Sequence, residues 1–213
     1  MPQPKVWSID GVTPVVDPSS YVHPSAVLIG DVIIGKNCYI GPGACLRGDF
    51  ARIVICDGAN VQDSCIMHGF PGTDTVVEEN GHIGHGAILH GCRVRRSALI
   101  GMNTVVNDNA EIGESAIVAA MSFVKAEMVV PPRMLAAGSP ARVLREVTEL
   151  EMVWKAEGTR TYQELTKRCL GTMQETEALT APEADRKRLN LPELLSLSEL
   201  KAKGLLTVPP DGA

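Results

Sequence analysis

Aromatic residues are scarce in this chain of 213 residues: they make up 4 % of it, although 45 % of the residues are hydrophobic. A core built from such a sequence has to be filled by Val, Ile, Leu and Ala, which suits a narrow and repetitive interior. Positive charge is also in short supply, since 20 Lys and Arg stand against 25 Asp and Glu and the net charge is −5. This balance argues against nucleic acid and against an anionic membrane surface as partners.

Targeting and membrane signals are missing as well. No window approaches the roughly 18 consecutive apolar residues that a membrane-spanning helix needs. The first residues, Met-Pro-Gln-Pro-Lys-Val-Trp, lack the apolar run of a signal peptide. None of the six cysteines is spaced as Cys-x-x-Cys, and most stand between apolar neighbours, where a free thiol acts as a small core residue. We therefore expect a soluble, cytoplasmic protein without a membrane segment.

What the sequence does contain is a six-residue period between Val22 and Val130. Aliphatic residues recur every six positions and glycine often follows them; the series includes Leu28, Ile34, Ile40 and Leu46 and, later, Val94, Ile100, Val106, Ile112, Val118 and Val124. This period is typical of a parallel β-helix, in which the aliphatic residues point inward and three hexads close one triangular coil of about 18 residues. The alternative, a β/α protein with a coincidental period, is poorly supported because residues 22–136 show no sustained helical spacing.

The period is interrupted at residues 69–82, which carry turn residues at both ends. We expect this stretch to leave the coil as a loop beside His68 and His85, because a long excursion from a regular scaffold is usually functional or mobile. Residues 1–21 contain four prolines and are expected to form an irregular cap on the first coil.

The C-terminal part of the chain departs from the repeat. We predict that residues 1–142 form the β-helix domain with its cap, and that residues 143–213 form a C-terminal helix and a tail. The segment Thr148-Glu149-Leu150-Glu151 is a capping box, which predicts a helix that covers the last coil or lies along one face. From Ala181 onward we expect a mostly solvated tail, with a short helix at 194–203.

Four of the five histidines lie between positions 68 and 90. Any one of them alone is compatible with an imidazole on an exposed strand edge, but the spacing of three of them favours a metal site. His68 and His90 are 22 residues apart. If the loop takes about four of these residues, about 18 remain, which is one full coil, and the two rings stack on one face. His85 precedes His90 by five residues, so it lies around a corner and is badly placed to join the other two within one chain.

A threefold assembly solves this geometric problem. If one face of a subunit meets the neighbouring face of the next, His85 of the partner subunit completes the set with His68 and His90. We therefore predict a homotrimer with Zn²⁺ at each interface. Three histidines leave the fourth position of the ion to water, as in catalytic zinc sites, and zinc lowers the pKa of that water to about 7.

Polar residues near the histidines are candidates for further roles. Gln62 lies one hexad before His68, and two roles stay open for it: orienting the water on the metal, or packing at the subunit interface. For Arg47 and Asp49 a structural ion pair across a trimer contact is the favoured interpretation, and a catalytic role is the alternative.

On these residues the sequence resembles the γ-class carbonic anhydrase family of hexapeptide-repeat proteins, over about residues 15–170. The resemblance is carried by Arg47-Gly48-Asp49, by Gln62-Asp63 with His68 following, and by His85 with His90 five residues later. It implies a left-handed parallel β-helix that assembles as a trimer and binds zinc or iron through the three histidines across the interface. It also implies active-site or interface roles for Gln62, Arg47 and Asp49, and matches Tyr162, more weakly, to a tyrosine near the metal in relatives.

Several segments resemble two branches of this family, one from phenylacetate degradation and one from carnitine operons: Met67-His68-Gly69-Phe70-Pro71, Gly81 to His85, Leu89 to Cys92, Gly101-Met102-Asn103 and Trp154-Lys155. The phenylacetate branch is associated with hydrolysis of coenzyme A thioesters in aromatic catabolism. Two departures from the γ-class pattern stand out: Phe50 replaces the Glu after Arg-Gly-Asp, and Gly69-Phe70-Pro71 replaces an acidic proton shuttle.

Both departures argue against fast CO₂ hydration. The leading prediction is therefore a zinc-dependent acyl-CoA thioesterase of phenylacetate or other aromatic catabolism. Carbonic anhydrase activity is the first alternative, acyl transfer to a small-molecule acceptor the second, and a metal-stabilised scaffold without chemistry the third. The histidines argue against transfer, and the open fourth position on the metal argues against the scaffold.

Overall fold

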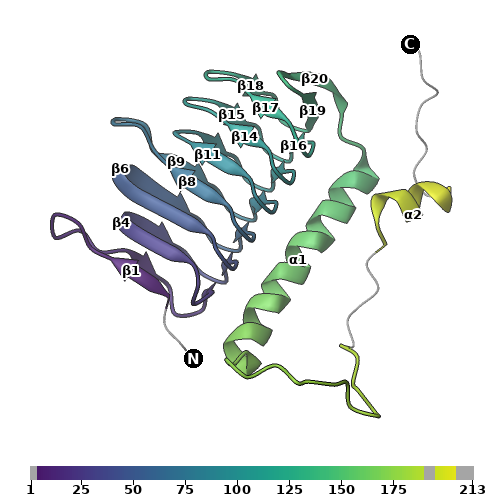
Figure 1. The fold of residues 1–213 in the computed structure, drawn as a ribbon. Helices are drawn as coiled ribbons and strands as arrows, with labels where there is room; N and C mark the ends of the chain where they lie inside the picture. Colours follow the sequence, from purple (N-terminus) through teal and green to yellow (C-terminus); the bar gives the residue numbers. More distant parts are fainter. Residues whose placement is uncertain (1–3, 190–194, 205–213) are drawn as a thin grey trace.

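The computed structural model describes residues 4–189 and 195–204, and these form a parallel β-helix with one long helix packed along its side (Figure 1). The prediction of the fold class is confirmed. No helix in the described part of the chain is long and apolar enough to cross a membrane.

The strands stack into three faces. Two of these faces form a single 12-stranded sheet, because two long strands continue around the corner between them. Face one consists of β1 (Lys5–Trp7), the first part of β4 (Val27–Ile34), the first part of β6 (Cys45–Ile55), β8 (Ile66–His68), β11 (Ile88–His90), β14 (Val105–Val106) and β17 (Phe123–Val124). Face two consists of β2 (Val15–Val16), the ends of β4 and β6, β9 (Thr75–Val77), β12 (Arg93–Val94), β15 (Glu111–Ile112) and β18 (Val129–Val130).

Face three is a separate 8-stranded sheet, and the long helix covers part of it. Its strands are β3 (Tyr21–Val22), β5 (Tyr39–Ile40), β7 (Asn60–Val61), β10 (His82–Ile83), β13 (Leu99–Ile100), β16 (Ile117–Val118), β19 (Met134–Gly138) and β20 (Ala141–Glu146). The last pair, β19 and β20, is antiparallel and closes the stack.

The core is a set of ladders, in which the inward residue of one coil lies on the inward residue of the next. On face one the register aligns six fully buried side chains: Leu28, Leu46, Met67, Leu89, Val106 and Val124. A narrow interior of this kind has no room for large rings, which explains the low aromatic content. The six cysteines are free thiols, and four of them are buried.

The prediction that residues 69–82 form a loop outside the coil is wrong for most of that stretch. Only residues 69–74 leave the regular path, with a bridge between Phe70 and Thr73. Residues 75–77 form β9, a buried strand that pairs with β6 on one side and β12 on the other. The short β-branched run Thr-Val-Val has strong strand preference, and its last residue takes an inward position of the ladder.

The N-terminal segment is more regular than predicted, because β1 and β2 both pair in parallel with β4 and complete the first coil. Residues 1–3 of the expected cap lie outside the described residues. At the other end, the expected domain boundary after residue 142 falls inside β20.

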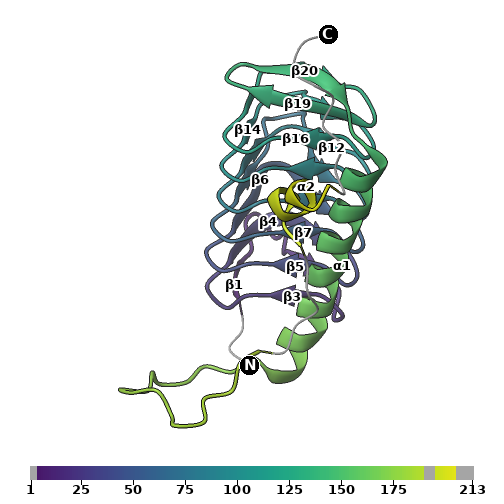
Figure 2. The same ribbon diagram turned by 90° about the vertical axis from the view of Figure 1, so that its right-hand side faces the viewer.

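The predicted C-terminal helix is present as α1 (Glu149–Thr172), and it begins with the expected capping box. Thr148 accepts a hydrogen bond from the backbone of Glu151, whose carboxylate accepts one from the backbone of Thr148 in return. The helix runs back along face three, from the last coil to the first (Figure 2). A second helix, α2 (Leu197–Ala202), lies within the short helix expected at 194–203, of which residue 194 is outside the described part.

Candidate metal centre

Two of the predicted metal ligands lie against each other on face one. His68 at the end of β8 and His90 at the end of β11 are register partners, one coil apart. Their rings are 5.2 Å apart between centroids, and Nδ1 of His68 lies 3.1 Å from Nε2 of His90. Two nitrogen ligands of a tetrahedral zinc ion, each at about 2.0–2.1 Å, stand about 3.3 Å apart. The observed separation fits a shared ion.

A carboxylate holds the other ring nitrogen of each of these histidines. Nε2 of His68 lies 3.0 Å from Asp49, and Nδ1 of His90 lies 2.6 Å from Asp108. Metal-binding histidines commonly give their second N–H to a carboxylate, which fixes the tautomer and turns the free nitrogen toward the metal. Here the two nitrogens without a carboxylate partner are those that face each other. The donor set therefore fits a divalent transition metal.

Arg47 and Asp49 form a pair within one chain, on β6. One guanidinium nitrogen of Arg47 donates to both oxygens of Asp49, at 3.0 and 2.9 Å. Burial acts to raise the pKa of Asp49, but the hydrogen bonds from Arg47 and His68 outweigh it and hold this pKa below its usual value. Asp49 is thus an anion that orients His68. The expected pairing across a subunit contact is realised inside the subunit.

A buried threonine joins the two histidine-bearing coils. The hydroxyl of Thr75 donates to the carbonyl of His68 at 2.6 Å and accepts from the amide of Gly91 at 2.9 Å. Its side chain is fully buried. Thr75 therefore reinforces the direct hydrogen bond from the amide of Gly91 to the carbonyl of His68, at 3.1 Å, which joins the two coils.

His85 stands apart from this pair, in the turn between β10 and β11. Its Nδ1 lies 2.6 Å from Asp63, and its Nε2 lies 3.5 Å from the hydroxyl of Tyr162 on α1. Like the other two histidines, it has a carboxylate on one ring nitrogen and no carboxylate on the second. Within the described residues of a single chain, no three His, Cys, Asp or Glu side chains gather closely enough to hold a metal.

The remaining two predicted site residues, Gln62 and Tyr162, lie on the same side of the chain as His85. Gln62 is 3 % exposed, and its amide contacts His82 rather than His68. Tyr162 packs edge-on against His82 and tilts against Tyr39, with ring centroids 5.5 and 5.2 Å apart. Burial, followed by the nearby charge of Asp63, raises the pKa of Tyr162 to about 12, so its phenol stays protonated.

Within one chain the predicted site residues therefore lie in two separate groups, which we call half-site one and half-site two. Half-site one is on face one and holds Arg47, Asp49, His68 and His90; half-site two is at the corner beside α1 and holds Gln62, His85 and Tyr162. Sequence reasoning missed the orienting role of Asp108, although a usable signal exists: it follows His90 by 18 residues, which is one coil.

Comparison with known proteins agrees with this architecture. The family model "Bacterial transferase hexapeptide (six repeats)" matches residues 13–48. The carnitine operon protein CaiE of Proteus sp. (strain LE138) is 54 % identical over 199 residues, which cover 93 % of this chain and 98 % of that protein. CaiE of Salmonella typhi is 60 % identical over 183 residues, with coverage of 86 % and 92 %.

The chain belongs to the CaiE family of hexapeptide-repeat proteins. Of the two branches that the sequence resembles, the relatives support the carnitine-operon branch, and closeness to the phenylacetate branch stays a prediction. A putative acetyltransferase from Bacillus cereus has a similar structure, with a TM-score of 0.78 and 32 % identity over 78 % of this chain and 97 % of that one. A hexapeptide transferase family protein from Anaplasma phagocytophilum gives 0.75 and 36 %, covering 77 % and 97 %.

Proposed function

We propose that this protein is a metal-dependent hydrolase of acyl-CoA thioesters that works as a homotrimer. In this proposal His68 and His90 of one subunit and His85 of the partner subunit hold a zinc ion between half-site one and half-site two. The observation that carries the proposal is common to all three histidines. Each has one ring nitrogen on a carboxylate, of Asp49, Asp63 or Asp108, and a second nitrogen free of one.

Zinc bound there would supply a Lewis acid and a water-derived nucleophile at neutral pH. The chain's own residues orient the histidine ligands and supply a hydrogen-bond donor beside them. The three aspartates fix the imidazole tautomers, and Thr75 reinforces the connection between the two histidine-bearing coils. Tyr162 keeps its proton, so its hydroxyl is available as a donor next to His85.

The preference for a thioester over CO₂ rests on the residues around His68. Phe50 is 61 % exposed and its ring centroid lies 5.2 Å from that of His68. Phe70, two residues after His68, is also exposed. An acyl group can bury apolar surface against such rings, whereas rapid CO₂ hydration needs a proton acceptor at these positions.

Acyl transfer is the second candidate, because two structural relatives with more than 30 % identity are named as a putative acetyltransferase and as a hexapeptide transferase family protein. Both reactions start from an acyl-CoA, and they differ in the acceptor: water for hydrolysis, an amine or alcohol for transfer. Carbonic anhydrase activity is the third candidate and rests on the resemblance of the histidine set.

One set of assays separates the three. The purified protein is incubated with acetyl-CoA, phenylacetyl-CoA and carnitinyl-CoA, the last because the relatives are named for a carnitine operon. Free thiol release is measured with and without amine and alcohol acceptors, CO₂ hydration is measured in parallel, and every assay is repeated after chelation and after zinc is restored. We expect thiol release that needs zinc and no acceptor. Release that requires an acceptor, equal rates for apo and zinc protein, or far more efficient CO₂ hydration would each refute hydrolysis.

A further inference from the structure

The side-chain amide of Gln62 lies between two polar neighbours under helix α1, Asn60 and His82. Its Nε2 donates to Oδ1 of Asn60 at 3.0 Å and lies 2.7 Å from Nε2 of His82. Asn60 and Gln62 are almost fully buried. Whether the amide nitrogen or the amide oxygen of Gln62 faces His82 depends on which nitrogen of the His82 ring carries the proton.

The helix decides that tautomer. The hydroxyl of Thr159 donates to the carbonyl of Lys155, four residues earlier in α1, at 3.2 Å. A hydroxyl that donates to that carbonyl accepts from its other neighbour, so Nδ1 of His82, 3.4 Å away, is assigned as the donor of that contact. In a neutral ring the other nitrogen, Nε2, is then an acceptor. Gln62 has to present an N–H to it.

The His82 ring is neutral because of where it lies. Burial, with smaller contributions from the charges of Lys155 and His85, lowers the pKa of His82 to about 3. The ring also packs edge-on against Tyr162. A doubly protonated His82 would place an N–H against the N–H of Gln62, whereas the neutral ring accepts from it.

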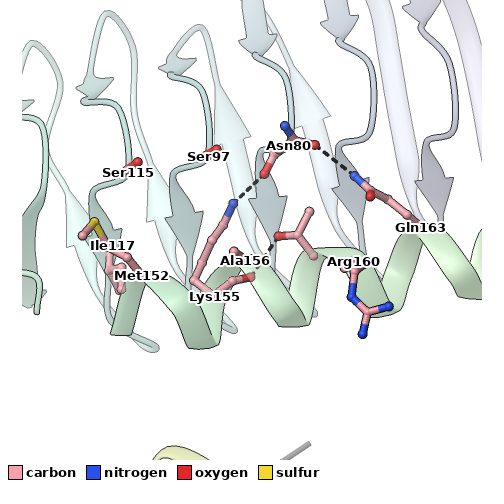
Figure 3. Close-up of a pocket in the computed structure, with 10 residues that line it drawn as sticks. Asn80, Ser97, Ser115, Ile117, Met152, Lys155, Ala156, Arg160 and Gln163 are labelled. Atoms are coloured by element: carbon pink, nitrogen blue, oxygen red, sulfur yellow. Dashed lines mark hydrogen bonds between the residues drawn. The ribbon is translucent and has the colours of Figure 1, made fainter. Parts of the chain in front are cut away.

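Hydrogen bonds attach helix α1 to the coil on both sides of Thr159. They hold Thr159 in contact with His82. Nζ of Lys155 donates to the carbonyl of Asn80 at 2.6 Å, and Nε2 of Gln163 donates to the side chain of Asn80 at 2.9 Å and to the carbonyl of Gly58 at 3.1 Å. Figure 3 shows Lys155 and Gln163 reaching from α1 toward Asn80, which stands between them. They line a cavity of about 440 Å³ between the helix and the coil corners.

We propose that His82 is a positioning residue, which, together with Thr159, locks Gln62 with both amide hydrogens engaged and its carbonyl oxygen as the free group. This inference rests on the proposed function, in which half-site two completes the metal centre. It assigns Gln62 the role of a hydrogen-bond acceptor toward the attacking water, and excludes it as a donor to a developing oxyanion. A water held by an acceptor presents its lone pair away from that acceptor, toward the carbonyl carbon that it attacks.

The first test reads the tautomer directly and does not depend on activity. The zinc-loaded trimer is labelled with ¹⁵N-histidine, and the His82 signals are assigned by their loss in His82→Gln. We expect a proton on Nδ1 and none on Nε2 throughout the range from about pH 5 to about pH 8, where an ordinary histidine titrates. In Thr159→Val the preference for Nδ1–H should weaken or disappear. A proton on Nε2, or ordinary titration of the ring, would overturn the inference.

The second test is kinetic and uses a matched pair of helix variants. Thr159 and Thr166 are both buried, and each donates to a carbonyl four residues earlier. Thr166 also lies 3.3 Å from the carbonyl of Cys38 on the coil, and only Thr159 contacts His82. Thr159→Val should lower kcat for thioester hydrolysis by about 10–100-fold, the range for groups that orient site residues, with unchanged KM and zinc content. Thr166→Val should leave kcat within about twofold, although it removes a hydroxyl of the same kind.

The third test uses the side chain at position 82. Glutamine at this position can accept from Gln62 and donate to Thr159 as histidine does, and leucine can do neither. His82→Leu should lower kcat as Thr159→Val does, and His82→Gln should restore most of it. Equal losses in both variants, or kcat losses that follow thermal stability, would show that His82 only fills space. If the unmodified protein has no hydrolase activity the proposed function fails, and the NMR experiment still decides whether His82 fixes the amide of Gln62.

Discussion

Nδ1 of His68 lies 3.1 Å from Nε2 of His90, and both atoms lack the carboxylate partner that the other nitrogen of each ring has. The two imidazoles are therefore oriented before any ion binds. One chain supplies this pair together with Asp49 and Asp108, and the third histidine, His85, lies in the turn between β10 and β11 and contacts Asp63.

Subunit complementation tests where the third ligand comes from. His85→Ala and His90→Ala should each lose most bound zinc as homotrimers. When the two are unfolded, mixed and refolded, a subunit with intact His68 and His90 can meet a partner with intact His85, so part of the zinc should return. Metal content per subunit, measured after gel filtration, gives the answer. His23→Ala is the control, because His23 contacts Ser25 and none of the other histidines. A monomer with full zinc occupancy would contradict the interface site.

Asp108 should matter for metal affinity without being a ligand. Asp108→Asn keeps the size of the side chain and removes the charge that holds Nδ1 of His90, 2.6 Å away. We expect zinc to bind about 10–100-fold more weakly, as for other orienting carboxylates. The measurement is competition with a chelator of known affinity. Asp31→Asn is a matched control, since Asp31 forms an exposed ion pair with Arg52 at 2.9 Å. Equal zinc affinities of the two variants would show that Asp108 does not support the site.

Thr75→Val should loosen the connection between the coils of His68 and His90. The variant keeps the shape of the side chain but loses the hydroxyl that bridges the carbonyl of His68 and the amide of Gly91. The free energy of unfolding should fall by about 1 kcal/mol, and zinc affinity should fall with it. Thr73→Val provides the comparison, because the hydroxyl of Thr73 makes a local bond to Phe70 in the excursion. If both variants bind zinc alike, the bridge has no part in holding the site.

Lys155 predicts a pH dependence of stability. Burial lowers its pKa from 10.5 to about 7, so between these pH values the unfolded chain binds more protons than the folded one. The free energy of unfolding should therefore gain a contribution as the pH rises from about 7 to about 10.5. Lys155→Met should flatten the curve over this interval. Urea unfolding at fixed protein concentration measures it, and Lys167→Met is the control because Lys167 is exposed and paired with Glu164. A slope that is the same in all three proteins would contradict the buried charge.

The fold could be predicted because each coil repeats the same local requirement. An inward aliphatic residue every six positions is visible in the sequence, and the ladders of face one place those residues in register. The prediction for residues 69–82 was wrong because only the first six residues leave the coil, and a strand follows at 75–77. Turn residues at 69–74 hid the point where the repeat resumes, and Val77 was the overlooked inward residue.

The site could be predicted in part for the same reason. A separation of 22 residues placed His68 and His90 one coil apart, and five residues placed His85 around the corner. The surroundings of Gln62 could not be predicted in this way. They depend on how α1 docks on face three, and the contact between His82 and Thr159 joins residues 77 positions apart in the chain. The six-residue period of the sequence does not predict how α1 docks on face three.

The direction of α1 has a consequence for how the protein is made on the ribosome. The helix begins beside the last coil and ends beside the first, where Tyr21 meets Met173, 152 residues later. Face three of the coils that leave the exit tunnel first therefore stays uncovered until α1 has been translated, after nearly the whole solenoid. Contacts so distant in sequence form slowly, and an uncovered sheet is a target for chaperones in the meantime. A nascent chain arrested before residue 149 should accordingly remain chaperone-bound, whereas one released after residue 173 can cover its own surface.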